Sequence, residues 1–269
     1  MIRTETFLTH LPLHHESKMI LVFRTLSYLA TLMILACVGR ATATELALHE
    51  GDNNPLAEGW ATYRTFNNVI TGPVTNDLGL GIDAWKVDDN GSSSGEGLYG
   101  QPLASQDILN AMNRGWKLST KLRVVDATAT GLGNGAVGVG FKTEGEFFSM
   151  AFGIEGDGSP LVHFYGTPIV VDLDDLDSGY HLYELVYSPS AGNADLFVDG
   201  QERYSDFPGV SGALVAPNVY FGSFAVDGAG HGNYSEVKFE VVPEPSSFVL
   251  AAITILSLAF YGWRRRKSQ

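Results

Sequence analysis

The chain has 269 residues, a formal net charge of −13 at pH 7 and a sequence pI of about 4.8. Between Thr44 and Val242 the imbalance is larger, with 9 Lys and Arg residues against 27 Asp and Glu residues and a net charge of −18. Such an acidic surface excludes nucleic acid and anionic lipid as partners, because both repel it. The single cysteine, Cys37, precedes this body, so the body has neither a disulfide nor a thiol nucleophile. A lipobox over Ile34–Cys37 is the alternative interpretation of that cysteine.

The first 43 residues have the pattern of a secretory signal peptide with a polar leader ahead of it. Met19–Arg24 is a short basic start, and the apolar run Leu26–Val38 follows. Ala41-Thr42-Ala43 then offers the small-x-small pattern of a cleavage site, and we expect cleavage after Ala43. Residues 1–18 are polar and unlike the start of a signal, so we take Met19 as the true first residue.

The body, residues 44–242, shows the period of two that is typical of strands. Residues 236–241 are a clear case, because Val237, Phe239 and Val241 alternate with charged residues. Asp199-Gly200 between two such runs predicts a two-residue hairpin. The only helical pattern covers Ser105–Arg114, with Ser105 as its cap. Many short strands and Gly-rich turns predict one all-β domain, an antiparallel jelly-roll sandwich with one short helix.

Paired carboxylates, the usual machinery of a glycoside hydrolase, are weakly represented. A retaining enzyme needs two carboxyl groups about 5 Å apart, one of which stays protonated. The best candidates are Glu155 with Asp157, in a glycine-rich turn, and Asp172 with Asp174. Neither pair has a third carboxylate in phase with it, so we assign no catalytic residue. His163 lies in an apolar strand pattern, which is typical of a hydrogen-bonded core or sheet-face histidine.

Two acidic stretches could bind calcium, which prefers several converging oxygen ligands. The first is Asp88-Asp89-Asn90, and the second runs from Asp172 to Asp177. Neither matches an EF-hand. We prefer the first, because Asn90 and neighbouring carbonyl groups could complete the ligand set. The sequence therefore predicts at most one calcium site, at Asp88, Asp89 and Asn90.

A sugar-binding surface needs exposed aromatic rings beside polar groups. The candidates are Trp60, Trp85, Tyr99, Tyr165 and Tyr234. Trp85 and Trp116 are in phase with core strands, so we expect both to be buried. Tyr234 follows the glycine-rich stretch 228–230, and we select it as the ligand contact.

The last 27 residues combine three features in order. Pro243-Glu244-Pro245 comes first, and residues 246–263 then form an uncharged run. As a helix this run would be roughly 27 Å long, close to the thickness of a bilayer core. Arg264, Arg265, Arg266 and Lys267 follow, which predicts a cytoplasmic C-terminus and a body outside the cytoplasm. The alternative is a hydrophobic helix docked on the domain.

This tail resembles the bacterial PEP-CTERM sorting signal, on the strength of Pro243-Glu244-Pro245, the span and the basic end. In that family the signal is read by an exosortase, a membrane-embedded protease or transpeptidase. The resemblance implies export, recognition near Pro243–Pro245, and transfer or release at the cell envelope.

The body resembles the concanavalin A-like lectin/glucanase superfamily, and laminin-G-like domains in particular, over roughly residues 82–242. The matching features are Tyr180-His181 opening a strand, Phe197–Gly200 at a hairpin, and Phe221-Gly222 before a glycine-rich loop. The resemblance implies a jelly-roll fold, frequent carbohydrate binding, frequent calcium, and hydrolase activity in some members.

Together these patterns predict an exported, envelope-anchored, non-catalytic β-sandwich protein that binds extracellular polysaccharide or a surface partner. One alternative is a structural matrix component without a saturable ligand. The other is an unusual glycoside hydrolase.

Overall fold

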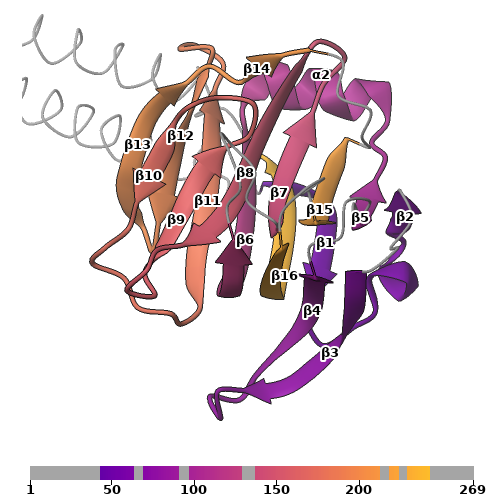
Figure 1. Cartoon of the computed structure of the whole chain (residues 1–269). Helices are drawn as coiled ribbons and strands as arrows, with labels where there is room; N and C mark the ends of the chain where they lie inside the picture. The colour runs from indigo at the N-terminus through magenta and orange to yellow at the C-terminus, as the bar shows by residue number, and fades with distance from the viewer. Residues whose placement is uncertain are drawn as a thin grey trace, which may run out of the picture. The chain divides into compact units, whose positions relative to one another are not determined.

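The computed structural model of the chain describes residues 43–63, 69–90, 97–128, 137–212, 218–223 and 229–242 (Figure 1). They belong to one compact unit, Thr42–Pro243. Ala41 of the predicted cleavage site, the Pro243–Pro245 motif, the predicted span 246–263 and the basic residues Arg264–Lys267 lie outside the described residues. Within the described ranges, no helix has the length and apolar character needed to cross a bilayer.

The described strands form two antiparallel sheets, which we call sheet A and sheet B. Sheet A has the order β13-β12-β11-β6-β16-β4-β3, with β1 also paired to β16. Its strands are β1 (Thr44–Glu50), β3 (Val69–Asp77), β4 (Ile82–Asn90), β6 (Trp116–Thr128), β11 (His181–Ser188), β12 (Asn193–Val198), β13 (Gln201–Phe207) and β16 (Ala229–Val241).

Sheet B has the order β10-β9-β8-β7-β15-β5-β2, with β14 also paired to β8. Its strands are β2 (Ala61–Tyr63), β5 (Gly97–Gln101), β7 (Val137–Lys142), β8 (Glu146–Ile154), β9 (Pro160–Phe164), β10 (Val170–Asp172), β14 (Val210–Ser211) and β15 (Val219–Ser223). A 3-10 turn, η1 (Pro55–Glu58), and one α-helix, α2 (Ser105–Arg114), complete the described elements.

The predicted all-β architecture, with two antiparallel sheets and one short helix, is confirmed. The helix covers the predicted residues, but its N-cap is Ala104, which makes no side-chain capping bond, so Ser105 is not the cap. The Asp199-Gly200 hairpin joins β12 to β13, and both residues have positive φ, as a tight two-residue turn requires. The jelly-roll connectivity stays a prediction.

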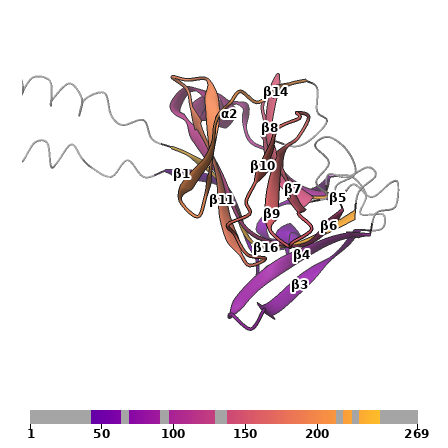
Figure 2. The same ribbon diagram turned by 60° about the vertical axis from the view of Figure 1, so that its left-hand side comes forward.

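The core lies between the two sheets, which face each other in Figure 2. Alternate residues of β6 point into it, and Trp116, Leu118 and Leu122 are fully buried. Trp116 stacks on Tyr187, with ring centroids 5.4 Å apart, and meets Phe148 of sheet B edge-on at 5.1 Å. The contact with Phe148 joins the two sheets, whereas the stack on Tyr187 lies within sheet A. The expected burial of Trp85 and Trp116 is confirmed.

Strand β8 is buried on both of its faces from Phe147 to Gly153. One face contributes Phe148, Met150 and Phe152 to the core. The opposite face therefore belongs to a second buried layer, on the side of sheet B away from sheet A.

Candidate functional site

The side of sheet B that points away from the core has its own arrangement of side chains, and we call it the outer face of sheet B. On β7, Val137, Val139 and Phe141 point into the core, so the intervening Gly138 and Gly140 lie on the outer face. Strand register extends this face across the sheet. One row, formed by residues paired in turn from β2 to β10, is Tyr63, Leu98, Gly222, Gly138, Ala151, His163 and Val170.

A second row on the same face is Ala61, Gly100, Tyr220, Gly140 and Ser149. Its central residue, Tyr220, lies across Gly140. A Cβ at Gly140 would lie 2.4 Å from Cζ of Tyr220 and 2.6 Å from Oγ of Ser149, so this position accepts only glycine without a shift of the ring. The Tyr220 hydroxyl and Ser149 Oγ form a hydrogen bond of 2.5 Å. Burial raises the pKa of Tyr220, so its hydroxyl stays protonated.

Leu98, Ala151 and Tyr220 form an apolar cluster that is separate from the main core. Tyr63 and Tyr165 are half-buried and pack against this cluster. Tyr165 follows β9, where its amide donates to the Ser149 carbonyl oxygen at 3.1 Å, and its ring lies 6.1 Å from that of Phe147. The outer face of sheet B thus has a floor of small residues with tyrosine rings beside it.

His163 lies in the first row, between Ala151 and Val170. It is 8% exposed, and neither ring nitrogen has a hydrogen-bond partner. Burial lowers its pKa, although the charge of Asp172 acts in the opposite direction, so the imidazole is neutral at pH 7. The predicted buried, sheet-face histidine is present, but the hydrogen bonds that usually accompany one are missing.

Charge on this face lies at its two ends. Beyond the His163 row, Asp172 pairs in register with Leu161, and loss of hydration together with the charges of Asp172 and Asp174 raises the pKa of Glu155. At the opposite end, Lys142 pairs with Phe147.

The candidate catalytic carboxylates therefore do not pair as the sequence suggested, which was Glu155 with Asp157 and Asp172 with Asp174. Glu155 is near Asp172 and Asp174, whereas Asp157 accepts hydrogen bonds from the amide and hydroxyl of Ser159 and stabilises its own turn.

The calcium site predicted at Asp88, Asp89 and Asn90 is wrong, because these residues end strand β4 and do not form a loop. Successive residues of a strand point to opposite faces. Asp89 is 2% exposed and accepts a hydrogen bond from Ser223 Oγ across the core, whereas Asp88 pairs with Lys86 at 3.6 Å. The two carboxylates cannot meet at one ion. Among the residues that the structure describes, no group of three or more His, Asp or Glu side chains is placed to hold a metal.

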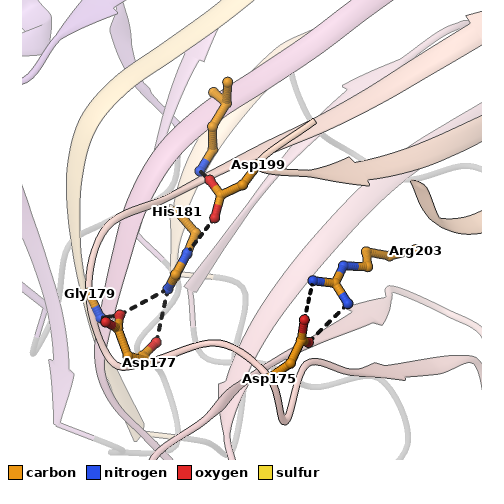
Figure 3. Close-up of polar contacts among 7 residues, drawn as sticks. Asp175, Asp177, Gly179, His181, Asp199 and Arg203 are labelled. Carbon is orange, nitrogen blue, oxygen red and sulfur yellow. Dashed lines mark hydrogen bonds and ion pairs between the residues drawn. The ribbon is translucent and has the colours of Figure 1, made fainter. Parts of the chain in front are cut away.

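The second acidic stretch is held by the protein's own cations (Figure 3). Asp175 accepts two hydrogen bonds from the Arg203 guanidinium, at 2.9 and 2.7 Å. His181 lies between Asp199 Oδ2, at 2.7 Å from Nδ1, and the Asp177 carbonyl oxygen, at 2.9 Å from Nε2. Both partners are acceptors, so both ring nitrogens donate and His181 is an imidazolium. We call these five residues the acidic-loop clasp.

The predicted ligand contact, Tyr234, is also wrong. Its ring is completely buried in the core, where its hydroxyl donates to the carbonyl oxygens of Gly138, at 3.0 Å, and Gly222, at 3.3 Å. The glycine-rich stretch before it continues into β16, so the ring follows the strand alternation into the core. Tyr234 therefore supports the floor of the outer face of sheet B from below.

The other aromatic candidates divide in the same way. Trp60, Trp85 and Tyr99 are buried, and Tyr165 alone of that set is half-buried. Sequence reasoning missed Tyr63 and Tyr220. The signal that could have located this face is the alternation Val137-Gly138-Val139-Gly140-Phe141, in which two successive outward positions of a central strand are glycine.

No protein-family model and no curated protein matches the chain. Among solved structures, it is similar to the conserved carbohydrate esterase of the Shiga toxin-encoding bacteriophage phi24B, with a TM-score of 0.54 and 11% identity over 74% of this chain and 99% of that one. This similarity shows that the two chains share a β-sandwich fold.

Two further solved structures are more distant. A Trypanosoma rangeli sialidase gives a TM-score of 0.45 and 13% identity, and covers 79% of this chain and 32% of its own. The binding domain of botulinum neurotoxin DC in complex with SialylT gives a TM-score of 0.41 and 14% identity, over 73% of this chain and 46% of its own.

Proposed function

We propose that this chain is an exported, envelope-anchored, non-catalytic protein whose outer face of sheet B binds an extracellular polysaccharide. The observation that carries the proposal is the combination, on one side of one sheet, of a floor of small residues with the half-buried rings of Tyr63 and Tyr165. Sugars stack their C–H faces on aromatic rings and hydrogen-bond to polar groups placed between them.

The chemistry of the face supports a sugar ligand over a protein ligand. Near the centre of the face the Tyr220 hydroxyl bonds to Ser149 and both side chains are buried, so the half-buried rings of Tyr63 and Tyr165 are the aromatic groups that a ligand can reach. Exposed apolar area is modest, because Leu98 and Ala151 are buried and only Val170 in these rows is a large exposed hydrophobic residue. A protein interface of comparable width would be expected to present a larger apolar core.

The shared fold gives the proposal independent support. The structure with a TM-score of 0.54 belongs to an esterase named for carbohydrate substrates. Export and anchoring are supported by the sequence alone, through the Ala41-Thr42-Ala43 cleavage pattern and through the Pro243–Pro245 motif with its following span and basic end. An exosortase-type enzyme is the partner that this tail implies.

Binding is tested with the full-length chain in a detergent without a sugar headgroup, applied to an array of bacterial and plant polysaccharides. We expect saturable binding that the variant Tyr63→Ala/Tyr165→Ala reduces at least tenfold. Leu80→Ala is the control, because Leu80 is 62% exposed on the β3–β4 turn, away from sheet B. No saturable binding would favour a structural matrix component, and release of reducing sugar would favour a hydrolase.

Export is tested separately, by N-terminal sequencing of the processed chain from cells that produce it. We expect the mature protein to begin at Thr44 and to be recovered with the membrane or outside the cell. An unprocessed chain in the soluble cytosolic fraction would contradict this part of the proposal.

A further inference from the structure

The turn between β3 and β4 exposes two leucine side chains. Leu78 is 53% exposed and Leu80 is 62% exposed. In both views this turn stands clear of the other described elements (Figure 1, Figure 2). Leu78 also has a positive φ of 55°, a backbone conformation that leucine rarely adopts. Neither the exposure nor the strained backbone stabilises the fold, which indicates a role for these leucines outside it.

The turn satisfies its own amide groups. Its four exposed residues, 78–81, all donate to acceptors within the same hairpin. Leu78 donates to Asp77 Oδ1 at 3.0 Å, Gly79 to the Asn76 carbonyl oxygen at 3.0 Å, Leu80 to the Asp77 carbonyl oxygen at 3.1 Å, and Gly81 to Asn76 Oδ1 at 2.6 Å. A segment that enters lipid loses the water that would otherwise bond to its amides, so it must satisfy them internally. This turn meets that requirement.

Asp77 fixes the turn to sheet A. Its carboxylate accepts hydrogen bonds from Arg123 of β6, from Tyr180 and from Asn233 of β16. The guanidinium also neutralises the carboxylate that directly precedes Leu78. A turn held in this way loses little conformational entropy when it docks against a partner.

Lipid fits this turn better than a sugar or a protein. Residues 78–82 are Leu-Gly-Leu-Gly-Ile, an uncharged stretch without an aromatic ring on which a sugar could stack. Two exposed leucines bury too little area for a stable protein interface. A lipid contact of that size is sufficient when another anchor already holds the protein at the membrane. Because Asp83 follows the stretch and is exposed, zwitterionic headgroups suit the turn better than anionic ones.

The predicted C-terminal span supplies such an anchor. Residues 242–245 alone separate the end of β16 from the span predicted to begin at residue 246. Fully extended, this link is roughly 17 Å long, so it keeps the body beside the bilayer that holds the span. A short tether raises the effective concentration of lipid at the body's surface, and a weak apolar contact then becomes effective.

We propose that Leu78 and Leu80 insert into the bilayer that holds the predicted span, as a second and reversible membrane contact with zwitterionic lipid. This inference rests on the proposed anchoring, and it goes beyond it by assigning a part of the folded body to the membrane.

The contact is measured with the full-length chain reconstituted into phosphatidylcholine vesicles. In a Cys37→Ser background, Leu80→Cys carries a fluorophore, and lipids brominated on their acyl chains quench a fluorophore that lies among them. The matched control is Ile70→Cys, because Ile70 is 56% exposed on the same hairpin, eight residues before Leu78. We expect quenching at residue 80 to be at least three times that at residue 70. Equal quenching at the two positions would overturn the inference.

Leu78→Asn separates a membrane role from a role in the fold. Asparagine adopts positive φ more readily than leucine does, so the unfolding midpoint should equal or exceed that of the unsubstituted chain. Quenching at residue 80 should nevertheless fall at least twofold. Unchanged quenching would overturn the inference, and so would a lower midpoint, because it would show that Leu78 is needed for the fold.

The lipid class is tested by replacing half of the phosphatidylcholine with phosphatidylglycerol. We expect weaker quenching at residue 80, with a difference that narrows at high salt, because Asp83 and the acidic body are repelled by anionic headgroups. Stronger quenching would overturn the choice of zwitterionic lipid. A chain that does not incorporate into either kind of vesicle would overturn the proposed anchoring itself, and this contact with it, whereas the glycan array is unaffected by that result.

Discussion

The outer faces of the two sheets are built from strands of the same kind, yet their side chains differ completely. On sheet A, charged residues pair with one another: Lys117 lies 3.0 Å from Glu184 and 3.5 Å from Glu240, and Lys238 lies 2.8 Å from Glu240. On sheet B, the central rows carry glycine, alanine, tyrosine and an unpaired histidine. One face pairs its charged groups with one another, and the other buries a histidine whose ring nitrogens have no hydrogen-bond partner.

The contrast is sharpest between Asp77 and His163. Asp77 is the centre of a closed network, because it accepts two hydrogen bonds from Arg123, at 2.9 and 3.0 Å, one from Tyr180, at 2.9 Å, and one from Asn233, at 2.7 Å. Although burial alone raises it, these hydrogen bonds hold the pKa of Asp77 below its usual range. A hydrogen-bond network of this kind stabilises the fold, whereas the two ring nitrogens of His163, which have no hydrogen-bond partner, destabilise it.

The largest expected effect is therefore on sheet A. Asp77→Ala leaves the Arg123 guanidinium, 18% exposed, without its carboxylate, and we expect a loss of about 3 kcal/mol in the free energy of unfolding. Glycan affinity of the folded protein should not change. Denaturant unfolding followed by tryptophan fluorescence measures the first quantity, and a binding titration well below the transition measures the second. A weaker glycan affinity in folded Asp77→Ala would contradict the conclusion that binding depends on sheet B and not on sheet A.

Gly140→Ala tests the floor of sheet B. The added Cβ would meet the Tyr220 ring and Ser149 Oγ, so the ring must move, at a cost of about 1–3 kcal/mol. We expect glycan affinity to fall as well, because the surface beside Tyr220 changes shape. Gly72→Ala is the matched control, since a Cβ there has open space around it. Equal affinity in Gly140→Ala and the wild type would argue against this floor as the binding surface.

Tyr234→Phe tests whether Tyr234 supports the floor of sheet B or contacts the ligand itself. It removes only the hydroxyl that bonds to Gly138 and Gly222, and we expect a loss of about 1 kcal/mol in the free energy of unfolding. Because this hydroxyl lies on the core side, affinity should fall only slightly if at all. A complete loss of binding without a loss of stability would restore Tyr234 as a ligand contact.

The smallest expected effect concerns pH and the acidic-loop clasp. Burial is the largest single influence on the pKa of His181, and it lowers that pKa. The bonds to Asp199 and to the Asp177 carbonyl together outweigh it, so the pKa of His181 lies above the usual value. Stability from this group is fully present below the unfolded pKa of about 6.5 and is lost as pH rises through the folded pKa. Because Asp199 is 46% exposed, we expect a few tenths of a kcal/mol.

The measurement is the difference in unfolding free energy between the wild type and His181→Gln, at pH 5.5 and at pH 9. The difference is needed because burial lowers the pKa of His49 and His163, and these residues contribute the opposite slope, losing stability as pH falls below about 6.5. A difference that grows with pH would contradict the assignment of His181 as an imidazolium.

The strands could be predicted because alternation and turn residues are local signals. The pattern of residues 236–241, the Asp199-Gly200 hairpin and the helix at Ser105–Arg114 all depend on neighbours in sequence, and all three are found. The calcium site predicted at Asp88–Asn90 was wrong because the structure there depends on residues that are distant in sequence. A polar run resembles a loop by propensity, but pairing with β3 and β16 on its two sides holds it in a strand.

The site could not be predicted because it is made by register between distant strands. Nothing near Tyr220 in the sequence indicates that Gly140 and Ser149 lie beside it, and nothing near His163 indicates that its flanking side chains are apolar. The wrong prediction for Tyr234 has the same cause, because its burial also depends on pairing with distant strands. Its glycine-rich neighbourhood suggested exposure, whereas Gly230 and Gly232 are strand residues paired with both β4 and β6.

The row from Tyr63 to Val170 runs from one described edge of sheet B to the other. Strands lie about 4.8 Å apart, so its six steps extend over roughly 29 Å. A glycan lying along that direction would meet no terminal wall among the described residues of the row, and it could be held by an internal stretch of its chain. Affinity should then increase with each added sugar until the width of the sheet is filled, and stay level for longer polymers.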